Sequence, residues 1–169
     1  MPGVSLTDGN DRHGKGYPMQ RILVVDDHAI VRKGLMKILK ESDAGICVDE
    51  AGHGQEALAL VLRTSYALVL MDISMPGRGG LDVLKEMKSH RPHLPVLMLS
   101  MHPEEEYAFR ALRAGASGYV TKDSAAEELV GAIRKVLSGG RYVSASLAEK
   151  LASEMDADFP LPVGGTPTP

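Results

Sequence analysis

The chain has 169 residues, of which 44% are hydrophobic and 24% charged, and its formal net charge is −3 at pH 7. This composition is typical of a folded globular protein, and the length is enough for one domain with a sizeable core plus tails. The lack of a basic surplus argues against direct binding of nucleic acid by this segment, and no apolar run approaches the roughly 18 residues that cross a bilayer. The chain has a single cysteine, Cys47, so a disulfide within one chain is excluded, and we expect a cytoplasmic protein. From the lack of a long apolar run we expect no membrane contact.

The first twenty residues lack the apolar segment of a secretory signal. They read MPGVSLTDGNDRHGKGYPMQ, in which polar and small residues predominate. We therefore expect residues 1–20 to form a flexible leader.

Five short apolar segments alternate with five segments of helical periodicity. Each apolar run is too short for a helix, so strands are predicted at 21–25, 46–51, 68–72, 95–100 and 118–121. Helices are predicted at 29–40, 54–63, 81–89, 103–115 and 124–137. In the first two helices the spacing predicts inner faces made of Ile30, Val31, Gly34, Leu35, Ile38 and Leu39, and of Ala57, Leu58, Val61 and Leu62.

The order of these segments predicts the fold class. Five βα units imply a parallel sheet that is covered on both faces through right-handed crossovers. We predict one doubly wound α/β domain over residues 21–139, a flavodoxin-like (βα)5 three-layer sandwich with the parallel sheet order 2-1-3-4-5. A capping box, Ser124 with Glu127, marks the start of its last helix.

Residues 140–169 have the composition of a linker with one short helix. Ser146 and Glu149 suggest a second capping box, and Leu147, Leu151 and Met155 recur every four residues. The chain then becomes rich in Pro and Gly. We expect this segment to lead to a C-terminal domain that is missing from the chain.

Acidic residues follow two of the predicted strands. Asp26 and Asp27 come after the first strand, and Asp72 ends the third. In the order 2-1-3-4-5 these strands flank the switch point, where ligands bind beyond the carboxyl ends of the strands. Three carboxylates this close raise one another's pKa unless a cation intervenes, and hard oxygen ligands select Mg²⁺ or Mn²⁺. The alternative is that one or two of these acids merely cap the following helices.

A hydroxyl and an ammonium group are predicted at the same rim. Ser100 ends the fourth strand and Lys122 follows the fifth. With an Asp nucleophile and a divalent ion, this set suits phosphoryl transfer. A lone Lys after a strand is more often a solvated surface residue, but a position opposite three acids favours a role in the site.

Two further signals are weaker. His90 and His93 have a spacing that could serve a metal, but no second pair completes a site, so a solvated loop is favoured. The run from Gly77 to Gly80 resembles a phosphate cradle but lacks the GxxxxGK[ST] pattern. It is better interpreted as the turn by which the backbone leaves Asp72.

Four motifs resemble those of a known family. VVDDH (24–28), LVLMDISMPG (68–77), LMLSMH (97–102) and GASGYVTK (115–122) are similar to the signatures of the receiver domain of two-component response regulators. The resemblance covers residues 21–137. The DDH sequence, Lys122-Asp123-Ser124 and the short helix after the domain are similar to the NarL/FixJ subfamily, which carries a LuxR-type helix-turn-helix output domain.

The resemblance implies a role for each acid. Asp72 is expected to accept a phosphoryl group from a sensor histidine kinase. Asp27, Asp72 and the backbone carbonyl of Ser74 are expected to ligate Mg²⁺, while Asp26 acts through water.

The resemblance also implies a switch. Lys122 would pair with the acyl phosphate, Ser100 would hydrogen-bond it, and Tyr119 would change rotamer as Ser100 moves. Ser74 and His102 would set the lifetime of the phosphorylated state. The chain would not be an enzyme acting on other substrates; it would form a homodimer on phosphorylation and reach DNA only through the missing domain.

Two alternatives use related chemistry or the same fold. A Mg²⁺-dependent phosphatase of the haloacid-dehalogenase kind also has an Asp nucleophile, but places it after the first strand in a D-x-D arrangement. A flavin-binding protein needs a hydroxyl- and Gly-rich loop after the first strand, where the acids here would repel the phosphate.

Overall fold

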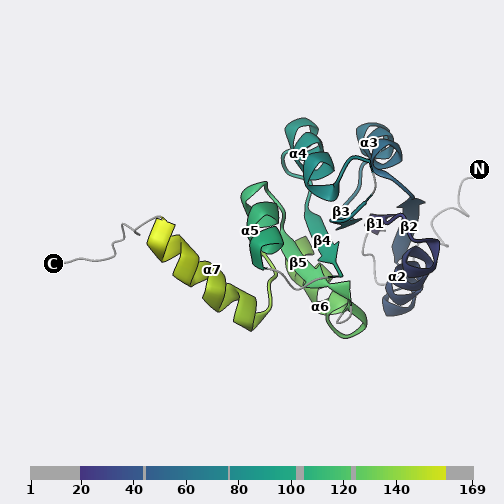
Figure 1. The fold of residues 1–169 in the computed structure, drawn as a ribbon. Coiled ribbons are helices and arrows are strands. Elements are labelled where there is room, and N and C mark those ends of the chain that lie inside the picture. The colour runs from purple at the N-terminus through teal and green to yellow at the C-terminus, as the bar shows by residue number, and fades with distance from the viewer. Residues whose placement is uncertain (1–19, 44, 76, 102–104, 123–124, 159–169) are drawn as a thin grey trace, which may run out of the picture.

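Five parallel strands form one sheet in the order β2-β1-β3-β4-β5 (Figure 1). The computed structural model describes residues 20–158, apart from residues 44, 76, 102–104 and 123–124. The strands lie close to their predicted positions: β1 Gln20–Val25, β2 Ile46–Ala51, β3 Leu68–Asp72, β4 Val96–Ser100 and β5 Gly118–Thr121. The predicted flavodoxin-like α/β fold and its strand order are therefore confirmed.

Side chains of the three central strands are buried on both faces of the sheet. All five residues of β3 and of β4 are buried, as is β1 from Ile22 onward. Alternate residues belong to two cores: Val69 and Met71 pack on one face, Leu68 and Leu70 on the other. This alternation follows from the two-residue period of a strand. Burial on both faces explains why β3 and β4 are apolar up to their last residues, Asp72 and Ser100.

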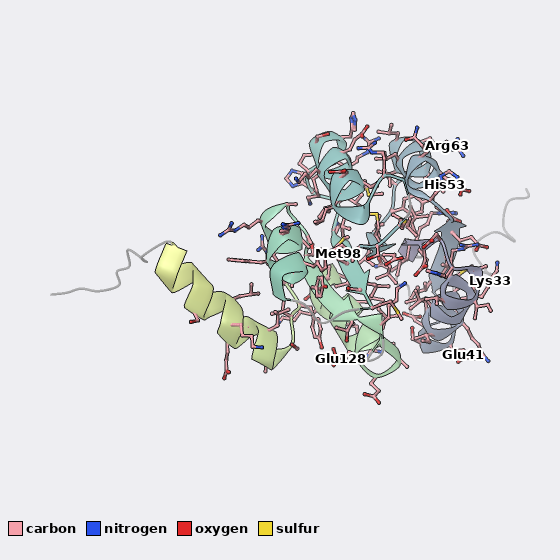
Figure 2. The ribbon with its side chains drawn as sticks, in the orientation of Figure 1. Lys33, Glu41, His53, Arg63, Met98 and Glu128 are labelled. Carbon is pink, nitrogen blue, oxygen red and sulfur yellow. The ribbon has the colours of Figure 1, made fainter. Side chains whose placement is uncertain are left out.

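Helices cover both faces of the sheet (Figure 1). Residues of α3 (Gly54–Arg63), α4 (Gly80–His90) and α5 (Glu105–Arg113) contribute to the core that contains Val69. Residues of α2 (Ala29–Ser42) and α6 (Ala125–Leu137) contribute to the core that contains Leu68. Figure 2 shows Met98 within the sheet, whereas the charged side chains of Lys33, Glu41 and Arg63 lie on the helices around it.

Three residues assigned to inner faces by the sequence pattern, Ile30, Gly34 and Leu62, are exposed instead. Ile30 is 88% exposed and Leu62 is 46% exposed. Ile30 precedes the buried Leu39 by nine residues, which is about two and a half helical turns, so the two side chains lie on opposite sides of α2. The inner face predicted for α2 was therefore too wide. In α3, Leu62 lies at the edge of the face that packs on the sheet.

The segment after α6 adds to the edge of the sheet. Tyr142 forms a parallel bridge with Gly118, its N–H donates to Ser117 O (3.0 Å), and its carbonyl accepts from Tyr119 N–H (3.1 Å). Its hydroxyl donates to Glu128 Oε1 at 2.9 Å. We call residues 141–144 the edge strap. The strap leaves room for no side chain at Gly118, where a Cβ would lie 2.5 Å from Tyr142 O.

Helix α7 (Ala145–Asp158) follows the edge strap and reaches α5 at its first turns (Figure 1). Ser144 Oγ accepts from Leu147 N–H at 3.2 Å, so Ser144 caps the helix. The predicted cap at Ser146 was wrong, because Ser146 is already the second residue of α7. The predicted cap of α6 at Ser124 lies outside the described residues. Among the residues that the structure describes, no helix is both long and apolar enough to span a membrane.

Candidate functional site

Three acids meet at the carboxyl ends of β1 and β3, the strands that flank the switch point of the sheet. Asp26 is fully buried and Asp72 is 1% exposed, while the side chain of Asp27 is 22% exposed. Oxygen atoms of these acids and a ring nitrogen of His28 lie within 4.8 Å of one another. The sequence-predicted carboxylates are therefore brought together in one cluster.

The ammonium group of Lys122 faces two of the acids. Lys122 Nζ lies 2.7 Å from Asp26 Oδ2 and 3.4 Å from Asp72 Oδ2, and its side chain is only 7% exposed. Lys122 follows β5, two strands away from Asp72 in the sheet, so its long side chain spans β4 to reach the cluster. The solvated alternative for Lys122 is thus excluded by its burial.

Backbone N–H groups hold the acids in place. Asp26 Oδ1 accepts from His28 N–H at 2.9 Å, and Asp72 Oδ1 accepts from Ser74 N–H at 3.1 Å. Both are i to i+2 bonds of the Asx type, which fix a carboxylate where a strand turns into a loop. Asp26 and Asp72 therefore each have one oxygen anchored by the backbone and the other in contact with Lys122.

One buried oxygen of each acid accepts no hydrogen bond of good geometry from the described part of the chain: Asp26 Oδ2, Asp27 Oδ1 and Asp72 Oδ2. The contacts of Lys122 with two of these atoms are ion pairs, in which one cation faces several negative charges. Buried anionic oxygens that share one cation and accept no hydrogen bond are costly, and a hard divalent cation takes such ligands. The donor set of the cluster therefore fits a magnesium-type ion.

Burial raises the pKa of the Asp72 carboxyl above its usual range, and the neighbouring charge of Asp26 adds to this effect. The Ser74 N–H and the charge of Lys122 act in the opposite direction, but they do not cancel the effect of burial. The folded protein therefore binds a proton at Asp72 more tightly than the unfolded chain. Without a cation, ionised Asp72 destabilises the fold.

Replacing Asp72 with Asn is expected to stabilise the cation-free protein by roughly 1–2 kcal/mol at pH 7, because the buried negative charge is removed. The pKa of Asp72 in the folded protein lies above the unfolded value of about 3.9. The free energy of unfolding of the parent therefore falls as pH rises from about 3.9 through the folded pKa, whereas that of Asp72→Asn does not. Below about pH 3.9, where Asp72 is protonated in both the folded and the unfolded parent, the two proteins are expected to be equally stable. Urea denaturation in EDTA across the pH range measures the difference; one that did not vary with pH would contradict this account.

Two predicted switch residues lie on the neighbouring strands β4 and β5. Ser100 is fully buried at the end of β4 and pairs in register with Thr121 of β5. Tyr119 is 3% exposed and belongs to the core that α5 helps to form. His102, predicted to set the lifetime of a phosphorylated state, lies outside the described residues.

One residue of the cluster, His28, and one beside it, Arg32, were not assigned roles from the sequence. His28 Nδ1 lies 3.4 Å from Asp26 Oδ1 and 3.3 Å from Asp27 Oδ1. Arg32 donates from Nη1 to the backbone carbonyl of Asp26 at 2.5 Å and from Nε to Glu50 Oε1 at 2.7 Å. The available signal was position, since His28 directly precedes α2 and Arg32 lies in its first turn, where Arg32 N–H donates to His28 O at 2.9 Å.

The glycine-rich segment before α4 acts as a turn, as expected. Gly77 has φ of +76°, which favours glycine, and Gly80 N–H donates to Ile73 O at 3.0 Å. A Cβ at Gly80 would collide with Asp72 O and lie 2.7 Å from Ile73 Cα. The turn thus brings the start of α4 directly against the backbone that carries Asp72.

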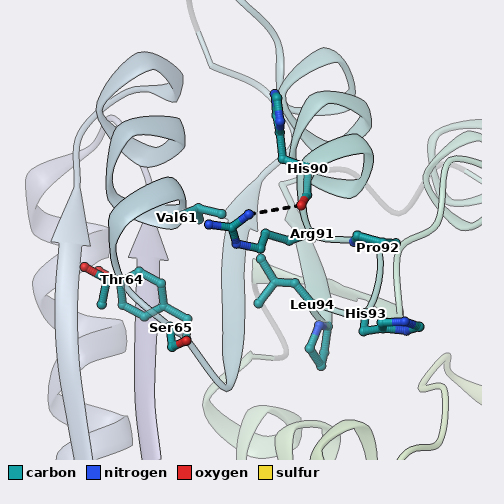
Figure 3. Close-up of a pocket in the computed structure, with 10 residues that line it drawn as sticks. Val61, Thr64, Ser65, His90, Arg91, Pro92, His93 and Leu94 are labelled. Carbon is teal, nitrogen blue, oxygen red and sulfur yellow. Dashed lines mark hydrogen bonds between the residues drawn. The ribbon is translucent and has the colours of Figure 1, made fainter.

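The histidines at the opposite end of the sheet form no cluster of metal ligands among the described residues. His90 and His93 line a pocket of about 310 Å³ between α3 and the start of β4. Figure 3 shows their rings pointing in different directions, with Arg91 reaching from this loop toward α3, where Nη2 donates to Leu62 O at 2.9 Å. The metal interpretation of this pair gains no support: both residues are exposed, but only His93 lies in the loop, because His90 is the last residue of α4.

Comparison with known proteins agrees with this geometry. The family described as "Response regulator receiver domain" matches residues 22–134. Response regulator GacA of Pseudomonas aeruginosa (strain PAO1) is 38% identical over 134 residues, which make up 79% of this chain and 63% of that protein. Response regulator UvrY of Escherichia coli (strain K12) is 37% identical, with 79% and 62% covered. The chain thus spans less than two thirds of the length of these curated relatives.

A solved structure supports the expected subfamily resemblance. The crystal structure of a LuxR-family two-component response regulator from Aurantimonas sp. SI85-9A1 aligns with a TM-score of 0.74 and 38% identity, covering 79% of this chain and 96% of that one. The phosphatase and flavin alternatives gain no support, because the central acid, Asp72, ends β3 and acids occupy the loop after β1. Since the family match covers more than half of the 169 residues, the chain belongs to the response regulator receiver domain family.

Proposed function

We propose that this domain is a phosphoacceptor switch, in which Asp72 receives a phosphoryl group from a sensor histidine kinase in a Mg²⁺-dependent reaction. The observation that carries the proposal is the buried Asp72 carboxylate beside two further acids and the ammonium group of Lys122. A nucleophilic carboxylate, ligands for a divalent cation and a fixed positive charge are the parts that phosphoryl transfer requires. In this proposal the domain turns over no substrate other than its own phosphoryl group.

Asp27, Asp72 and the backbone carbonyl of Ser74 would hold Mg²⁺ or Mn²⁺, with Asp26 acting through water. The oxygens without hydrogen bonds support this assignment. When bound, the ion would neutralise charge that develops on the transferring phosphoryl group. Asp26 also has a second task, because its 2.7 Å ion pair with Lys122 holds the ammonium group near Asp72.

In the transfer, an Asp72 carboxylate oxygen forms a bond to phosphorus as the bond between phosphorus and the histidine nitrogen of the kinase breaks. The imidazole leaves with the electron pair of that bond and takes up a proton. The Lys122 ammonium group, 3.4 Å from Asp72 Oδ2, would pair with the new acyl phosphate. The Ser100 hydroxyl would then hydrogen-bond the phosphoryl group, and Tyr119 would change rotamer as Ser100 moves.

The consequences reach beyond this chain. A homodimer formed on phosphorylation, control of transcription through a C-terminal DNA-binding domain and a cytoplasmic location belong to the same proposal. The names of GacA and UvrY as response regulators support it. Ser74, which is exposed, and His102 would set the lifetime of the phosphorylated state.

The proposal is tested by mixing the chain with acetyl phosphate and Mg²⁺ and following its intact mass. The parent is expected to gain one phosphoryl group, which is lost slowly after the donor is removed. Asp72→Asn and the parent in EDTA are expected to gain none. Asp82→Asn, which removes an exposed acid of α4, is the matched control and is expected to be labelled like the parent.

Labelling of Asp72→Asn at the parent's rate would overturn the assignment of the acceptor. Rapid hydrolysis of phosphomonoesters by the parent, with no stable adduct, would favour the phosphatase alternative.

A further inference from the structure

A groove of about 600 Å³ lies between α5 and α7, on the side of the domain that carries the edge strap. Its lining is mainly apolar and comes from both helices and from the strap: Phe109, Leu112, Val143, Ala148, Leu151 and Ala152. Two of these residues, Ala148 and Ala152, are exposed and small, which lets another helix approach closely. An apolar groove between two helices is suited to a third helix.

The rim of the groove is basic. Arg113 and Arg141 line it, and the guanidinium carbon of Arg113 lies 4.2 Å from the centre of the Phe109 ring. Lys88 of α4 is a third cation near Arg141. Burial is the main cause that lowers the pKa of Lys88, and the charge of Arg141 lowers it further. Arg113 and Arg141 are exposed, so an anionic partner would meet positive charge at this rim.

Helix α7 of another copy has the properties of such a partner. The helix leaves the domain beyond its contact with α5, as Figure 1 shows, and has 14 residues. Its sequence is acidic, with one lysine, Lys150, against Glu149, Glu154, Asp156 and Asp158. The groove and the helix that fits it thus belong to the same surface, which is the condition for a two-fold symmetric contact.

We propose that two copies of this chain associate through this groove, each placing α7 against α5 and α7 of the other to form a four-helix contact. Each copy supplies an apolar wall, a basic rim and an acidic helix, so the contact closes on itself at two copies. The inference deepens the proposed function by naming the dimer surface, and it rests on that function for its response to phosphorylation.

The test compares the association of the full chain and its variants by analytical ultracentrifugation, with and without acetyl phosphate and Mg²⁺. The parent is expected to dimerise in at least one state, more weakly at higher salt because the rim charges are screened. Leu151→Glu places an acid inside the groove and is expected to weaken the dimer at least about tenfold. Ser153→Glu adds the same charge at an exposed position of α7 outside the groove and is expected to have little effect.

Circular dichroism of Leu151→Glu shows whether the domain is intact, and Arg141→Glu gives a second variant outside the core, since Arg141 is exposed. Arg141→Glu is also expected to weaken the dimer, and its effect should disappear at high salt. A parent that is monomeric in both states, or equal effects of Leu151→Glu and Ser153→Glu, would overturn the proposed contact. Intact-mass labelling of the same samples reports on Asp72 separately, so a lost contact and a lost acceptor are distinguishable.

Discussion

Replacing Lys122 with methionine is expected to lower the free energy of unfolding by about 3–5 kcal/mol at pH 7 in the absence of divalent cations. Lys122 is the cation in contact with both buried acids, at 2.7 Å from Asp26 and 3.4 Å from Asp72. The variant leaves these carboxylates in a nearly dry environment without a countercharge. Urea denaturation in EDTA measures the loss, which should shrink when Mg²⁺ is added, since an ion that binds only the folded state stabilises it.

A double variant identifies the cause of this loss. In Lys122→Met combined with Asp26→Asn, the charge that Lys122 neutralises is also removed, so we expect at least half of the lost stability to return. Lys37→Met is the matched control, because the side chain of Lys37 is 75% exposed and its ion pair with Glu41 is long, at 3.8 Å. Equal losses in Lys122→Met and Lys37→Met would show that the buried charges do not determine the effect.

Replacing Gly80 with alanine is expected to destabilise the domain by about 2–3 kcal/mol and to slow phosphorylation of Asp72. A Cβ at this position would collide with Asp72 O and lie 3.0 Å from Ile73 O. Both contacts are with backbone atoms, so they are relieved only if α4 or the end of β3 moves. Such a movement would displace the Asp72 carboxylate from Lys122, and both thermal unfolding and acetyl phosphate labelling would report it.

The neighbouring glycine provides the control for this prediction. A Cβ at Gly79 would have no heavy atom within 4 Å, and the φ of Gly79 is −71°, which any residue adopts. Gly79→Ala is therefore expected to cost less than about 1 kcal/mol, the effect of an N-cap change alone. Similar losses in the two variants would mean that glycine flexibility in the loop, and not the close approach at Gly80, is what matters.

The sheet and the acidic cluster were predictable because both depend on local patterns. Strands that are buried on both faces are apolar up to their last residues, so residues 68–71 are visible as a short apolar run that Asp72 ends. Asp26 and Asp27 follow β1, and the carboxyl ends of β1 and β3 share one edge of the sheet. The convergence of Lys122 on this edge also follows from strand order. The roles of Asp72, Ser100 and Tyr119 in a switch remain predictions from the resemblance.

Other features depend on tertiary contacts that no local pattern encodes. The exposure of Ile30 depends on which side of α2 meets the sheet, and a stripe of six apolar positions does not define its centre. The contact of Arg32 with the Asp26 carbonyl requires the position of α2 relative to the end of β1. The bridge between Tyr142 and Gly118 joins residues on either side of α6, and a single tyrosine in a linker-like segment gives no sign of it.

The bridge made by Tyr142 bears on where the domain can be shortened. Because Tyr142 takes up the hydrogen bonds of Ser117 O and Tyr119 N–H, a fragment ending at Gly139 would present these groups of β5 to solvent. Bare strand edges recruit other chains into intermolecular sheets. A truncated fragment should therefore precipitate or form fibres more readily than one that retains residues up to Ser144, although both contain every acid of the cluster.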